Sequence, residues 1–198
     1  MDIEKATDVE ILTINNKFGR LDVEDDEFPG NTFNHIGILD VFSYCLSEHE
    51  AVEFLSSFKD HNLKYEDKFK SFFKEIFLWI QEKAVYIHVG TSFNKEFKNM
   101  KPSDFKDFRN RLSKEEYNLL LQLVEYKTNT FKVDSIEGLL FFVTLSTREI
   151  SFSNFFIPEL ETVVIGNYEL SFPIYSKQQN AFNQCEKYAK DVGLFIRR

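Results

Sequence analysis

The sequence predicts an α+β fold, in which a helical group from about residue 36 to residue 127 packs on a mainly antiparallel sheet built from both ends of the chain. Three observations support this prediction. Residues 65–83 place apolar side chains at helical spacing, residues 84–90 form a short apolar run, and residues 162–175 contain two apolar runs joined by Gly166-Asn167. Because no linker, repeat or low-complexity tract interrupts the chain, residues 1–198 are expected to form a single domain.

The central helix is predicted over residues 65–83, YEDKFKSFFKEIFLWIQEK. Its apolar side chains recur three and four positions apart, which is the spacing of one helical face. Leu78 and Trp79 widen that face at its end, so the last two turns are expected to be buried. Trp79, the only tryptophan, is therefore expected to lie in the middle of the molecule.

Capping signals and apolar periodicity place the other elements. Ser47 and Ser113 each precede a glutamate by three positions, and this pattern is a capping box that begins a helix. Further helices are predicted over residues 36–46, 47–58, 113–126, 135–146 and 176–191. Strands are predicted over residues 9–14, 20–23, 84–90, 149–156, 162–165, 168–175 and 194–198.

Within these elements, several side chains carry specific expectations. Val52 and Phe54 are expected to face inward from the 47–58 helix. The Gly166-Asn167 pair is typical of a two-residue type II′ hairpin turn. Pro173 lacks an amide donor, so the second strand of that hairpin should lie at a sheet edge or end its pairing nearby.

Composition indicates a soluble, cytoplasmic protein. Of the 198 residues 43% are hydrophobic, which suits one core that needs no disulfides, and two cysteines do not make a disulfide framework. The acidic start, MDIEKATDVE, is unlike a secretory signal, and no apolar run reaches the ~18 residues that a membrane-spanning helix needs. We therefore expect no membrane association.

The net charge of −8 is concentrated in the first third of the chain. Residues 1–63 hold 14 acids and 4 bases, whereas residues 64–132 hold 10 acids and 14 bases, and residues 133–198 hold 8 acids and 6 bases. An acidic surface of this kind repels nucleic acid and anionic membranes and favours a basic partner.

The densest acidic segment is DVEDDE, residues 22–27. Its like charges repel one another, which predicts an exposed loop. The segment lacks the glycine and the twelfth-position glutamate of a calcium loop, so no metal is expected there. The alternatives are a solvated loop and a partner-binding surface, and the residues proposed to contact a partner are Asp22, Glu24, Asp25, Asp26 and Glu27.

Candidates for chemistry are few. Cys45, His49 and Glu53 stand four positions apart, but a helix that begins at Ser47 would separate them, so Cys45 is interpreted as a small, buried, inert side chain. His88 lies in the predicted strand 84–90 and is interpreted as a hydrogen-bonded core histidine, with a general base as the alternative. No glycine-rich phosphate loop occurs, and no cofactor is expected.

A basic, aromatic region occupies residues 92–112. Stacking rings among cationic side chains are what single-stranded nucleic acid requires. The phenylalanines of this region nevertheless fall at helical spacing, and acids dilute its charge, so core packing explains the region more simply and nucleic-acid binding is not expected.

The function predicted from these features is that of a non-enzymatic acidic protein that binds and neutralises a basic macromolecule, in the manner of a bacterial immunity protein or antitoxin against a nuclease toxin. The first alternative is a small hydrolase or transferase that uses His88 with carboxylates brought together by the fold. The second alternative is a structural subunit of a larger assembly, which predicts a large exposed apolar patch.

Overall fold

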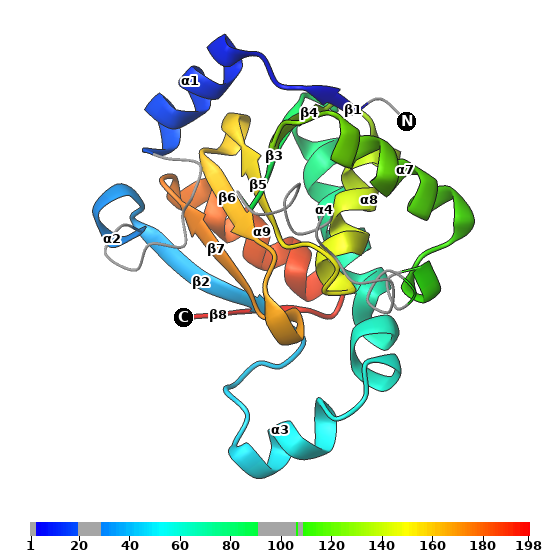
Figure 1. Ribbon diagram of the computed structural model, residues 1–198. Coiled ribbons are helices and arrows are strands. Elements are labelled where there is room, and N and C mark those ends of the chain that lie inside the picture. The colour runs from blue at the N-terminus through cyan, green and yellow to red at the C-terminus, as the bar shows by residue number, and fades with distance from the viewer. Residues whose placement is uncertain (1–2, 20–28, 91–105, 107–108) are drawn as a thin grey trace.

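The computed structural model describes residues 3–19, 29–90, 106 and 109–198, and within these ranges it shows seven α-helices and an eight-stranded sheet (Figure 1). The strands are β1 (Ile3–Lys5), β2 (His35–Asp40), β3 (Val85–Val89), β4 (Thr130–Val133), β5 (Ser153–Ile157), β6 (Thr162–Ile165), β7 (Phe172–Ser176) and β8 (Phe195–Arg197). The helices are α1 (Asp8–Phe18), α2 (Pro29–Thr32), α3 (Glu48–Phe54), α4 (Lys64–Trp79), α7 (Lys114–Glu125), α8 (Ile136–Thr147) and α9 (Gln179–Asp191).

The predicted α+β class is confirmed, and every strand pair of the described sheet is antiparallel. The strand order is β1-β4-β3-β5-β6-β7-β2-β8. As predicted, both ends of the chain contribute strands. β2, from the first quarter of the sequence, lies between β7 and β8.

Helices cover both faces of the sheet. Helices α4, α8 and α9 lie on one face with the larger hydrophobic cluster, and α1 lies on the other face (Figure 1). Since successive side chains of a strand point to opposite faces, neighbouring residues of β5 enter different clusters: Phe155 packs against Phe73 of α4, and Phe156 packs against Phe18 of α1. The smaller cluster consists of Ile14, Phe18, Phe33, Phe156, Val163 and Ile165.

The central helix is confirmed as α4, but the position expected for its tryptophan is wrong. The face of α4 that packs on the sheet consists of Phe69, Phe72, Phe73, Ile76 and Phe77, all of which are buried. Leu78 and Trp79 project from the other side of the last turn, and Trp79 is 37% exposed with its ring edge against Tyr188 of α9.

Two predictions in the first quarter of the chain are corrected. Residues 9–14 were predicted as a strand, but they belong to α1, because Thr7 and Glu10 form a capping box whose hydrogen bonds begin a helix. Residues 36–46 were predicted as a helix, but 35–40 form β2 and 41–46 form a loop. β2 lies near the edge of the sheet between two strands, and ladder hydrogen bonds on both sides outweigh the helical spacing of its apolar residues.

The remaining predicted elements agree more closely with the structure. The predicted helices at 113–126, 135–146 and 176–191 correspond to α7, α8 and α9, and the predicted strands at 84–90 and 194–198 contain β3 and β8. The predicted strand at 149–156 overlaps β5, which begins four residues later and ends at Ile157. The predicted strand at 20–23 lies outside the described residues.

The strands on either side of Gly166-Asn167 pair as predicted, but the connection is longer than a two-residue turn. A short turn, Tyr168–Leu170, stands between β6 and β7. The glycine is required for another reason: a Cβ at Gly166 would lie 2.6 Å from Ser146 Oγ at the end of α8. Pro173 marks the end of β6–β7 pairing, whose last partner is Ile174, although β7 itself lies inside the sheet.

A buried ion pair joins α4 to the end of α8. Glu66, 5% exposed, accepts two hydrogen bonds from Arg148, of 2.6 Å from Nε and 2.8 Å from Nη2. Lys70 Nζ and Thr147 Oγ1 also donate to this carboxylate, at 2.6 and 3.2 Å, and Arg148 Nη1 donates to the Arg111 carbonyl. Burial acts to raise the pKa of Glu66, but the hydrogen bonds and charges of Arg148 and Lys70 outweigh it, and the pKa lies below its usual value.

Candidate functional site

The acidic residues proposed to contact a partner, Asp22, Glu24, Asp25, Asp26 and Glu27, lie outside the described residues. The same holds for most of the basic, aromatic region at 92–112. Their roles therefore stay predictions from the sequence. The described part of the first third of the chain offers a different candidate, which begins where β2 ends.

His88 agrees with its interpretation as a core histidine. The residue is 7% exposed in β3, and its Nδ1 lies 2.9 Å from Thr130 Oγ1 on the neighbouring strand β4. A ring held in this way by the sheet has little surface on which a substrate could lie.

Cys45 is not the buried side chain that the sequence predicted. The capping box at Ser47 is present and α3 begins after Cys45, so the Cys45, His49 and Glu53 stripe is broken as expected. Cys45 is nevertheless exposed, because the chain leaves the sheet after Asp40 and residues 41–46 run as a loop over the surface.

The loop and helix that follow β2 form an arm that projects from the body of the molecule, residues 41–58, called here the α3 arm (Figure 1). None of the residues of α3 is buried. Val52 is 71% exposed, Tyr44 49% and Phe54 41%, although Val52 and Phe54 were predicted to face inward. The error arises because the helix stands away from the sheet, so no core is available to cover its apolar face.

The charge of the α3 arm has one sign. Residues 41–58 contain three glutamates, Glu48, Glu50 and Glu53, and no lysine or arginine. Glu50 closes the capping box with Ser47 and also accepts a hydrogen bond from Tyr44 Oη at 2.9 Å. The Ser47 hydroxyl and amide and then the Tyr44 hydroxyl lower the pKa of Glu50, which keeps this carboxylate ionised. Glu48 and Glu53 are exposed.

Aromatic packing holds the base of the arm. The Phe42 ring stacks on Phe54 of α3, with ring centres 5.8 Å apart, and on His61, with ring centres 6.1 Å apart. His61 lies in a single turn of π-helix, residues 59–63, just before α4, and is 1% exposed. The arm is therefore fastened to the body through Phe42 at its start.

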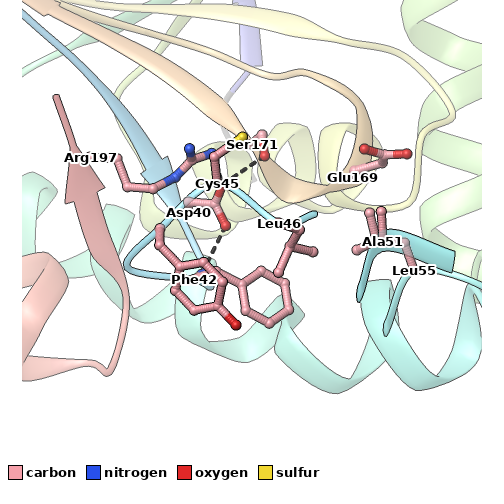
Figure 2. Close-up of a pocket in the computed structure, with 10 residues that line it drawn as sticks. Asp40, Phe42, Cys45, Leu46, Ala51, Leu55, Glu169, Ser171 and Arg197 are labelled. Atoms are coloured by element: carbon pink, nitrogen blue, oxygen red, sulfur yellow. Dashed lines mark hydrogen bonds and ion pairs between the residues drawn. The ribbon is translucent and has the colours of Figure 1, made fainter. Parts of the chain in front are cut away.

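A cavity of about 150 Å³ lies between the α3 arm and the body (Figure 2). Its walls come from the end of β2, the arm, the Tyr168–Leu170 turn with the residue after it, and β8. The lining residues are Asp40, Phe42, Tyr44, Cys45, Leu46, Ala51, Leu55, Glu169, Ser171 and Arg197.

At one end of the cavity, a buried acid is fully paired. The Asp40 carboxylate accepts hydrogen bonds from Ser171 Oγ at 2.7 Å, from the Phe42 amide at 2.8 Å and from Arg197 Nη2 at 2.5 Å (Figure 2). The Asp40 side chain is 4% exposed and the Arg197 side chain 18%. Asp40 and Arg197 thus neutralise each other. Arg197 Nε is buried and has no hydrogen-bond partner among the described residues.

At the other end lies Glu169, whose backbone is unusual. Glu169 and Leu170 both have φ of 58°, in the left-handed region that non-glycine residues rarely adopt. Such a conformation costs about 1–3 kcal/mol per residue and persists where surrounding contacts enforce it. Here the Glu169 amide donates to Glu149 Oε1 at 2.9 Å, and the Glu169 carbonyl lies 3.0 Å from His61 Nε2.

The contact with Glu169 fixes the proton on His61. A carbonyl oxygen can only accept, so Nε2 carries a hydrogen and donates it to Glu169. Nδ1 is buried and has no partner among the described residues. The ring is therefore held between Phe42, which lines the cavity, and the backbone of Glu169.

The cavity carries a net charge of −1 from two carboxylates and one guanidinium. Since Asp40 and Arg197 are paired, the uncompensated charge is that of Glu169, which is exposed and lies across the cavity from Arg197 (Figure 2). Leu46, Ala51 and Leu55 supply apolar parts of the lining. The arrangement can hold a group that combines an aliphatic stem with a positive charge.

Sequence reasoning missed this site almost completely. Asp40 and Arg197 are 157 positions apart, and His61 and Glu169 are 108 apart, so no local pattern relates them. One signal was available: the capping box at Ser47 already indicated that α3 starts afresh after β2. The uniform acidity of residues 41–58 could also have been read from the sequence.

Comparison with protein-family models, with curated proteins and with solved structures finds no match for this chain. Every helix in the described ranges is too short or too polar to cross a bilayer. In the same part of the chain, no three His, Cys, Asp or Glu side chains gather in a way that could hold a metal ion.

Proposed function

We propose that this protein is a non-enzymatic acidic binding protein that engages a basic protein partner, as an immunity protein or antitoxin engages a nuclease toxin. The observation that carries the proposal is the surface of the α3 arm, where exposed apolar side chains stand among glutamates and no base is present. The acidic segment 22–27 adds five further acids to the same third of the chain.

The arm contains both kinds of side chain that protein interfaces use, apolar anchors and charged rim residues. Apolar and aromatic anchors contribute most of the affinity, and Val52, Tyr44 and Phe54 are the candidates here. Charged groups at the rim mainly accelerate association by steering the partner, which Glu48 and Glu53 would do for a basic protein. An acidic arm also repels nucleic acid. If the partner is a nuclease, the arm would compete with its nucleic-acid substrate for the same basic surface.

The test combines affinity capture from the source cell with two double variants. Glu48→Gln/Glu53→Gln removes two charges from the arm, and Glu75→Gln/Glu125→Gln removes two exposed charges from α4 and α7 as the matched control. We expect wild type and control to retain the same basic protein and the arm variant to retain less of it. If no basic protein distinguishes the arm variant from the control, the proposal is wrong.

The retained protein is then purified and its association rate is measured against salt. The rate should fall with ionic strength for wild type and fall less steeply for the arm variant, because screening acts on the charges that were removed. Asp25→Asn/Asp26→Asn should have the same effect if segment 22–27 contributes to the surface. Val52→Asp, at a position 71% exposed, should raise the dissociation rate without unfolding the protein.

A further inference from the structure

We propose that the cavity beneath the α3 arm receives a lysine or arginine side chain of the partner, with Glu169 as its counter-ion. This inference rests on the proposed function, since it names the group by which a basic protein is held. It adds a specific recognition site to a surface that would otherwise act through general charge.

The size of the cavity argues for a single side chain. Pockets for cofactors and drug-sized ligands usually measure roughly 300–1,000 Å³, and this cavity of about 150 Å³ is well below that range. Asp40 and Glu169 lie on opposite sides of its lining, Leu46 lies between them, and Ala51 and Leu55 lie on the side of Glu169 (Figure 2). An aliphatic stem can lie along such walls while its charged end stays near the rim.

The charges of the cavity select a cation. Arg197 Nη2 donates to Asp40 and Arg197 Nε is buried, so the positive charge of the guanidinium is offset by the Asp40 carboxylate. Glu169 therefore carries the uncompensated charge of the cavity. The α3 arm beside it, residues 41–58, adds only negatively charged side chains. An anion would meet the net negative charge of the cavity and of the α3 arm.

The backbone of Glu169 supports a recognition role for its carboxylate. A glutamate in the left-handed region is held there by His61 on one side and Glu149 on the other. Strained residues that are fixed by their surroundings concentrate at binding and catalytic sites. The left-handed backbone fixes the position of Glu169 at the edge of the cavity, so only its side chain has to be ordered when a cation binds.

Cys45 provides a reporter that does not require the partner. Cys45 is exposed and lines the cavity, whereas Cys185 is buried, and burial raises the pKa of the Cys185 thiol to about 12. Iodoacetamide should therefore alkylate only Cys45 in the folded protein. The probes are Nα-acetyl-lysine amide, which carries the proposed cation, and Nα-acetyl-norleucine amide, which has the same stem without the charge.

We expect the lysine probe, at about 10 mM against an affinity on the order of 1 mM, to slow alkylation of Cys45 several-fold. The norleucine probe should have less than half of that effect. In Glu169→Gln the two probes should slow alkylation of Cys45 to the same extent. In Glu161→Gln the lysine probe should still slow it more than the norleucine probe. Glu161 is a suitable control because it is also a glutamate in the left-handed region, with φ of 47°, but it does not line the cavity.

The outcomes separate this inference from the proposed function. If the two probes act equally on wild type, or if Glu169→Gln leaves their difference intact, the cavity does not select a cation and the inference is overturned, even if the arm binds a basic partner. If the lysine probe protects Cys45 through Glu169, the site is supported even when capture finds no basic protein. With a partner in hand, Glu169→Gln should weaken its binding at least fivefold, and an unchanged affinity counts against the inference.

Discussion

Replacing Glu66 by glutamine keeps the shape of a buried side chain and removes its charge. In the folded protein this charge faces Arg148 at 2.6 and 2.8 Å, and the two side chains are 7% and 17% exposed. Loss of one member of a buried ion pair usually costs about 3–5 kcal/mol, because the other charge remains buried without its partner. Arg148 keeps its contacts with Glu116 and the Arg111 carbonyl, so we expect the lower limit, about 3 kcal/mol.

The cost should depend on pH. The pKa of Glu66 is lower in the folded protein than in the unfolded chain, so its contribution to stability is fully present above the unfolded value of 4.5 and is lost as the pH falls through the lower, folded value. The free energy of unfolding of wild type should therefore exceed that of Glu66→Gln most at pH 7, and this difference should shrink below about pH 4.5.

Urea unfolding at pH 7, 5 and 3.5 measures this difference. Glu75→Gln, which changes an exposed glutamate on the same helix, should alter the free energy of unfolding by less than about 0.5 kcal/mol. In thermal melts at pH 7, a loss of about 3 kcal/mol corresponds to a Tm lower by roughly 6–12 °C for a domain of this size. A loss at pH 7 no larger than that of the control, or one independent of pH, would refute the reasoning.

Two further predictions concern a close contact and the thiols. Gly166→Ala should lower the free energy of unfolding by about 1–3 kcal/mol because its Cβ would overlap Ser146, whereas Gly90→Ala, whose Cβ would meet nothing within 4 Å, should be nearly neutral in the same urea titration. Titration with a chromogenic thiol reagent should detect one thiol, Cys45, in the folded protein and a second, Cys185, only after denaturation; rapid reaction of both in buffer contradicts the described burial.

The sequence predicted the fold class well where local signals and packing agree. The regular inward face of α4 and the capping box at Ser113 each point to the structure that is found. They succeed because an amphipathic face and a satisfied helix end favour the same conformation before any tertiary contact forms.

Prediction failed where a second signal overrides the one that was read. Residues 9–14 are rich in β-branched side chains, yet the local Thr7–Glu10 capping box directs them into α1. Residues 35–40 have helical spacing, but tertiary contacts override it because they pair on both sides in the sheet. The cavity could not be predicted at all, because its two ends depend on the Asp40–Arg197 pair and on the contact between His61 and Glu169.

The position of β2 in the sheet has a consequence for how the chain folds during synthesis. β2 is translated early, but its two neighbours are β7 and β8, and the Asp40–Arg197 bond spans 157 positions. Until β7 and β8 have been synthesised and have left the ribosome, both edges of β2 lack strand partners and Leu39 cannot be covered by the sheet. Such long loop closures make folding slow, and an unpaired strand is a site of aggregation. A nascent chain stalled before β7 should therefore need a chaperone, and the α3 arm, which follows β2 directly, should acquire its final orientation only when the C-terminal strands dock.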